Sequence, residues 1–199
     1  MSKITRREFH LGTGLALTGL AALGAAKAAA AAPSPAMTST EKPLSRILFG
    51  SCCHQDKPQP IWQPILEREP ELFIFLGDNI YGDTRDMATL KAKYDQQAHN
   101  FAALRGSSEV IAIWDDHDFG ENDAGKDYPE KARSKDLFLD FWQEPADSSR
   151  RRADDGIYTS ALYGPADQRV HVILPDLRYN RDPLRTVESR ARARERDLA

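Results

Sequence analysis

Short apolar runs and helically spaced apolar positions follow one another along most of the chain. Continuous apolar runs, typical of buried strands, predict strands at 46–51, 72–76 and 110–114. Apolar residues spaced three and four apart predict helices at 62–69, 86–104 and 129–142. Two further strands are expected at 156–163 and 169–174. Because the strands alternate with helices at first and become consecutive later, the pattern favours an α/β layered sheet over an all-β sandwich.

Polar clusters follow each of the first three predicted strands. They are Cys52-Cys53-His54, Asp78-Asn79 and Asp115-Asp116-His117. In open α/β sheets, ligands gather at the carboxyl ends of the strands. If the three strands are neighbours, the clusters converge on one rim of the sheet. The polar stretch from Asp118 to Tyr128 is expected to be a loop.

The net charge bears on nucleic-acid binding, and the two cysteines bear on how the fold is stabilised. The formal net charge is −3, and leaving out the first 32 residues leaves 23 basic and 29 acidic residues, a net charge of −6. Such a body predicts no specific nucleic-acid partner, because that affinity comes from neutralising phosphates with basic side chains. Cys52 and Cys53 are adjacent, and adjacent cysteines rarely pair because the bridge strains the backbone. Stability must then come from the core or from bound metal.

Residues 1–32 have the pattern of a signal peptide: a basic start, a weakly apolar stretch and small residues near the end. The apolar stretch is too short and too rich in glycine to hold a stable membrane span. Thr5-Arg6-Arg7-Glu8-Phe9 resembles the twin-arginine export signal, and an ordinary secretory signal is the alternative. The prediction is engagement with the export machinery and a periplasmic or secreted location. Residues 33–45 are expected to be a linker.

The three polar clusters together offer the ligands of a mixed metal site. Hydrolysis of phosphate esters is very slow in water, and cations held close together can activate water and bind the phosphoryl oxygens. Hard cations prefer carboxylate oxygens, whereas thiolate and phenolate suit iron or zinc. The clusters supply carboxylates and thiols, and a tyrosine lies close behind Asp78.

Four motifs in order resemble the alkaline phosphatase D (PhoD-like) branch of the calcineurin-type metallophosphatases. They are Phe49-Gly50-Ser51-Cys52, the segment 75–83 (FLGDNIYGD), the segment 114–123 (WDDHDFGEND) and the segment 176–182 (DLRYNRD). The resemblance covers 46–184. It implies an α-β-β-α metallophosphatase sandwich, of which this chain would form an incomplete part. It also implies small phosphomonoester or phosphodiester substrates, and iron together with calcium as cofactors.

The same resemblance implies roles for individual residues. The implied metal ligands are Cys52, Asp78, Tyr81 and Asp116. His117 would stabilise the transition state as a hydrogen-bond donor, and Arg178 would contact the phosphate with its forked guanidinium. Asp115 would orient the ligands around it, since neighbouring residues on a strand point to opposite faces and cannot both face the metal.

Each of these residues also has a structural interpretation. Cys52 could be a small buried residue at a strand end, and Asp78 could cap a turn after Gly77. The segment 121–123 is either a solvated loop or a calcium contact. Cys53 is expected to pack, and His54, His99 and His171 are expected to be structural, with His54 a weak candidate for the rim.

The family's later Gly-Asp-x-His segment, which supplies further ligands, does not occur in this sequence. Residues 185–199 carry alternate arginines and few apolar residues, which predicts a solvated helix or a disordered tail. The expectation is therefore a truncated domain with an apolar face and open strand edges, and with reduced activity. The alternative hypothesis is a non-catalytic module that keeps a partial cation site.

Overall fold

The structure is a computed structural model that describes residues 36–37 and 42–185. Every described residue belongs to one compact unit of the chain. The predictions for the signal peptide and for nearly all of the arginine-rich tail lie outside the described residues. Across 36–37 and 42–185, no helix combines the length and the apolar character needed to cross a membrane.

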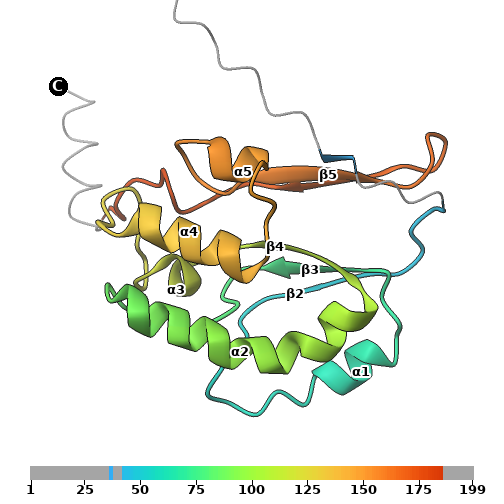
Figure 1. Cartoon of the computed structure of the whole chain (residues 1–199), viewed down its shortest axis with the longest axis horizontal. Helices are drawn as coiled ribbons and strands as arrows, with labels where there is room; N and C mark the ends of the chain where they lie inside the picture. The colour runs from blue at the N-terminus through green and yellow to red at the C-terminus, as the bar shows by residue number, and fades with distance from the viewer. Residues whose placement is uncertain (1–35, 38–41, 186–199) are drawn as a thin grey trace, which may run out of the picture. The chain divides into compact units, whose positions relative to one another are not determined.

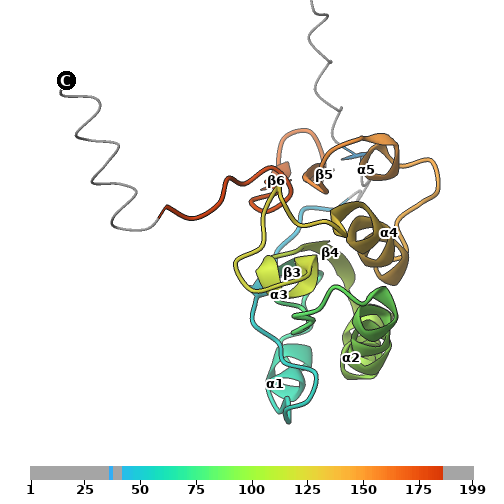
Figure 2. The same cartoon turned by 90° about the vertical axis from the view of Figure 1, so that its left-hand side faces the viewer.

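The described residues contain two three-stranded sheets. The first is wholly parallel, in the order β2 (Ile47–Gly50), β3 (Leu72–Leu76), β4 (Glu109–Ile113). The second has the order β1 (Ala36–Met37), β5 (Thr159–Tyr163), β6 (Val170–Leu174), with β1 parallel and β6 antiparallel to β5. The two views of the ribbon agree that this second sheet lies on one side of the parallel sheet and that α1 and α2 lie on the other (Figures 1 and 2).

Five helices connect these strands in the described part of the chain. They are α1 (Trp62–Leu66), α2 (Met87–Ser107), α3 (Asp116–Phe119), α4 (Lys131–Phe141) and α5 (Ser149–Arg152). The Asp86 side chain caps α2 by accepting a hydrogen bond from the Ala88 N–H at 3.1 Å. The mixed α/β architecture with a parallel sheet is thus confirmed.

β3 lies at the centre of the core. Leu72, Phe73 and Phe75 are at most 2% exposed, as the continuous apolar run predicts for a strand covered on both faces. Phe75 packs on Phe101 of α2 with ring centroids 4.6 Å apart, and Trp62 of α1 lies 5.1 Å from Phe101. This aromatic contact fixes both helices on one face of the parallel sheet.

Several details differ from the sequence predictions. β2 was expected to be buried, but Phe49 is 69% exposed, because in the described chain β2 lies at the sheet edge with β3 as its neighbour. The predicted linker at 33–45 contributes β1, and Ser45 N–H donates to Glu71 at 2.6 Å. The helices α3 and α5 were not predicted, because both are four residues long and show no apolar period.

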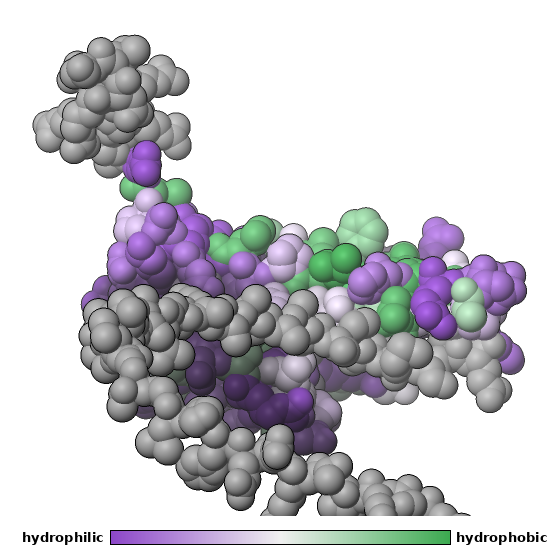
Figure 3. All heavy atoms as spheres, turned by 90° about the horizontal axis from the view of Figure 1, so that it is seen from above, coloured by the Kyte–Doolittle hydropathy of each residue, from purple (hydrophilic) through white to green (hydrophobic). Residues whose placement is uncertain are grey.

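Apolar side chains also reach the surface beyond β2. Ile173 of β6 is 65% exposed, and Figure 3 shows hydrophobic residues on the face of the molecule that carries the second sheet.

Candidate metal centre

The loops that follow β2, β3 and β4 meet at one edge of the parallel sheet, as the sequence predicts. Parallel pairing in register brings Gly50 beside Phe75, and Leu76 beside Ile113. The first two loops are then joined directly, since Cys53 N–H donates to the Asp78 carbonyl at 2.7 Å. Residues far apart in sequence therefore share one rim.

Gly77 makes the close contact between the β3 and β4 loops possible. Its φ is +105°, and a Cβ at this position would lie 2.6 Å from the backbone nitrogen of Asp115. Both the conformation and the space exclude larger residues. Cys52 and Asp78 also have positive φ, at 63° and 52°, and strained backbone of this kind gathers at functional sites.

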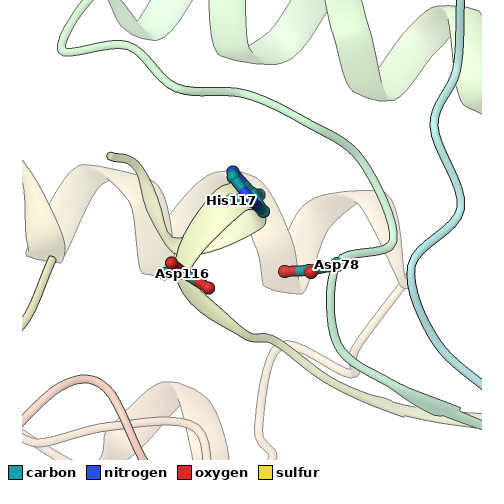
Figure 4. A group of neighbouring side chains, drawn as sticks. All are labelled: Asp78, Asp116 and His117. Carbon is teal, nitrogen blue, oxygen red and sulfur yellow. The ribbon is translucent and has the colours of Figure 1, made fainter. Parts of the chain in front are cut away.

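Asp78, Asp116 and His117 form the centre of the site. Each offers a ligand atom, and these atoms lie within 4.8 Å of one another. Figure 4 shows Asp78 on the loop after β3, and Asp116 and His117 on α3, with the three side chains around a common space. The Cys52 thiol joins them, with Sγ 3.5 Å from Asp78 Oδ2.

Among the residues of the site, Asp78 has the surroundings that most strongly favour cation binding. It is 8% exposed, and its Oδ1 is buried without a hydrogen-bond partner in the described structure. Burial raises the pKa of Asp78, and the nearby Asp115 and Asp116 carboxylates raise it further against the effect of His117. A buried carboxylate oxygen without a donor is costly, and a bound cation removes that cost.

Tyr81 lies between two histidine rings. Its ring stacks on His54 with centroids 4.7 Å apart, and the His117 ring packs against it at a tilt of 32° with centroids 4.2 Å apart. Burial raises the pKa of Tyr81 well above its ordinary value, and the Asp78 carboxylate and the Cys52 thiol add to the rise. Without a cation the phenol therefore stays protonated, whereas a cation beside these groups would lower its pKa and favour phenolate.

His117 is oriented by a residue that the sequence analysis did not single out. Its Nδ1 lies 2.7 Å from Asp83 Oδ1. Burial lowers the pKa of His117, but the hydrogen bond and charge of Asp83 outweigh this effect, so the net shift is upward. The imidazole is thus biased toward its protonated, hydrogen-bond-donating form. Asp83 is the last residue of the FLGDNIYGD motif, two positions after Tyr81. That position in the motif was the sequence feature from which its role could have been predicted.

Arg178 reaches the site from the segment after β6. Its guanidinium donates to Asp115 Oδ1 and, at 3.2 Å, to Asp116 Oδ1. Burial raises the pKa of Asp116, but the Asp123 N–H and Arg178 lower it more, so the net shift is downward and the carboxylate form is favoured. The Asp123 N–H donates to Asp116 Oδ2 at 2.7 Å, which gives the segment 121–123 a direct contact with the site.

Asp115 and Asp116 lie at the start of α3, which corrects the expectation that they end a strand. Asp115 is the extended residue immediately before the helix, and Asp116 is its first helical residue. The Asp115 side chain is 42% exposed and pairs with Arg178, while Asp116 faces Asp78 and His117. The separation of the two carboxylates is as predicted, although the helix start and not strand alternation produces it.

Asp118 is a structural centre that the sequence analysis assigned to a loop. It is fully buried and accepts hydrogen bonds from the backbone N–H groups of Asp78, Asn79 and Asp115 at 2.6–3.3 Å. Burial raises the pKa of Asp118 well above its ordinary value, and the backbone donors oppose that rise. The residue ties the β3 loop to the start of α3, and so fixes the spacing of Asp78 and Asp116.

No family model and no curated protein matches this sequence. Among solved structures, one described as "Structure of PhoD" is similar, with a TM-score of 0.53 and 17% sequence identity. The similarity covers 76% of this chain and 34% of that chain, so the present chain spans about a third of the length of its match. The comparison confirms a PhoD-like fold.

Proposed function

We propose that this chain contributes to a metal-dependent hydrolase of phosphate esters, acting on phosphomonoesters or phosphodiesters. The observation that carries the proposal is the buried, unpaired oxygen of Asp78, located where Asp116, His117 and Cys52 meet. The Cys52 thiol is the hydrogen-bond donor to the other oxygen of this carboxylate, and cation binding would account for the burial of Oδ1 without a donor. The PhoD-like fold supports the same interpretation.

The donor set fits a mixed metal centre. Cys52 and Tyr81 would hold iron through sulfur and phenolate oxygen, and Asp78 and Asp116 would supply carboxylate oxygens to iron and calcium. When bound, such cations activate a water molecule and neutralise charge on the phosphoryl oxygens. The carboxylates of the site repel one another, and bound cations would relieve that repulsion.

His117 and Arg178 would act on the substrate. Asp83 holds the His117 ring by one nitrogen, which leaves the other free to donate a hydrogen bond to a phosphoryl oxygen. Arg178 is anchored by Asp115 and Asp116 at the border of the cluster. Its remaining N–H groups would orient the phosphate, while Asp115 fixes the direction of the guanidinium.

Two further parts of the proposal concern the protein as a whole. A complete α-β-β-α sandwich would add a helical layer outside the β1-β5-β6 sheet, where Ile173 of β6 is exposed. The pattern of residues 1–32 supports export to the periplasm or beyond by the twin-arginine route.

The test is metal content and turnover on the same purified protein. The full chain would be loaded with iron and calcium, separated from free metal and assayed with chromogenic phosphomonoester and phosphodiester substrates. We expect bound metal that is lost in Asp78→Asn and retained in Asp95→Asn, a matched change on the exposed face of α2. Protein that binds neither cation would refute the proposal. Retained metal without turnover would favour the alternative of a non-catalytic cation-binding module.

A further inference from the structure

A set of glutamine side chains lies between α2 and the two ligand-bearing loops. Gln55 and Gln97 are 4% and 0% exposed, which is unusual for an uncharged polar side chain of this length. Neither was expected to be buried, and Gln97 occupies a position beside the apolar stripe of α2. Buried amides of this kind need all their hydrogen bonds satisfied, so their partners show what they hold in place.

Gln55 binds the backbone of Tyr81 at both of its polar groups. The Gln55 Oε1 accepts from the Tyr81 N–H at 2.8 Å, and the Gln55 Nε2 donates to the Tyr81 carbonyl at 3.2 Å. One side chain from the β2 loop thereby fixes a residue of the β3 loop in the manner of a strand pair. Lys93 of α2 also donates to the Tyr81 carbonyl, at 2.8 Å.

Gln97 bridges the same two loops from the helix side. Its Nε2 donates to the Cys53 carbonyl and to the Asn79 carbonyl, both at 2.8 Å. Its Oε1 accepts from the side-chain amides of Gln59 and Asn100. Each carbonyl that Gln97 holds belongs to the residue directly after a predicted ligand, Cys52 or Asp78.

We propose that Gln55 and Gln97 are positioning residues that set the separation of Cys52, Asp78 and Tyr81 before any metal binds. This inference rests on the proposed function, since it takes these three residues as ligands. The two amides act through the backbone and touch no predicted ligand atom. They fix both loops to each other and to α2, so that sulfur, carboxylate and phenol face one space without the cation having to order them.

Isosteric substitutions separate this role from simple packing. Gln97→Glu keeps the side-chain shape but replaces the donor to two carbonyls with an acceptor, and Gln55→Glu removes the donation to Tyr81 in the same way. Gln55→Met keeps a similar volume without polar atoms or charge. Gln168→Glu is the matched control, because Gln168 is exposed in the turn between β5 and β6.

The measurement is iron(III) titration of the full chain, followed by the visible phenolate-to-iron absorbance per bound iron. Tyr81→Phe identifies that absorbance, and gel filtration restricts the comparison to folded protein. We expect the Gln55 and Gln97 variants to bind iron about 10- to 100-fold more weakly, with a shifted or weaker absorbance per bound iron, and the Gln168 variant to match the wild type.

The outcomes distinguish the two proposals. Wild-type protein that binds neither iron nor calcium overturns the proposed function. Wild-type protein that binds iron, together with Gln55 and Gln97 variants of unchanged affinity and absorbance, leaves the function in place and overturns the positioning role.

Discussion

Asp118→Asn is the sharpest test of how the site is held together. Asp118 Oδ1 accepts from the N–H groups of Asp78 and Asp115, and Oδ2 accepts from the backbone and side-chain N–H groups of Asn79. Asparagine has the same shape but only one acceptor oxygen. Whichever way the amide turns, its NH₂ group faces two N–H donors that have lost their acceptor.

The expected loss follows from those two donors. An unsatisfied buried N–H costs about 1–3 kcal/mol, and removing the charge relieves part of the desolvation of the carboxylate. We therefore expect the free energy of unfolding to fall by about 2–4 kcal/mol. That is a substantial fraction of the roughly 5–15 kcal/mol of a typical domain.

Urea unfolding in the presence of a chelator gives this quantity without any contribution from bound metal. The control is Asp95→Asn, because Asp95 pairs with Lys91 on the exposed face of α2, where substitutions change stability by about 0.5 kcal/mol or less. An Asp118→Asn variant as stable as the wild type would refute the reasoning. It would show that the carboxyl is already neutral in the folded protein and donates rather than accepts.

Further predictions concern thiol chemistry, pH and the core. Cys52 is exposed, whereas burial raises the pKa of the Cys53 thiol to about 11. Iodoacetamide should therefore modify Cys52 first, and bound metal should slow that reaction. Equal modification rates of the two cysteines in peptide mapping would contradict this prediction. In metal-free protein the raised pKa of His117 contributes stability that is complete below its unfolded pKa and lost as pH rises through its folded pKa. Asp83→Asn should remove that part of the pH dependence in urea unfolding and lower the pKa of His117 in an NMR titration; an unchanged titration would exclude the ion pair. Arg150→Ala should lower the free energy of unfolding by about 3–5 kcal/mol. The reason is that Arg150 is 5% exposed and donates to backbone carbonyls of β4 and of the segment before β5. A loss below about 1 kcal/mol would show that water replaces these hydrogen bonds.

The local pattern of the sequence was sufficient for the main elements and for the rim of the sheet. β3 follows from a continuous apolar run, and α2 and α4 follow from helically spaced apolar positions. Both patterns are properties of residues close together in the sequence. The meeting of the three loops follows as well, because parallel neighbouring strands end at one edge. The sequence therefore sufficed to predict that Cys52, Asp78 and Asp116 lie close together.

Tertiary structure alone decided which polar side chains are buried and what they hold. Asp118 and Gln97 look like ordinary solvated residues in sequence, and both are fully buried because backbone groups from distant loops surround them. Arg178 meets Asp115 across 63 residues, a contact that no local pattern encodes. Periodicity reports the apolar side of each element, whereas the hydrogen-bond partners of a polar group exist only after separate segments pack against each other.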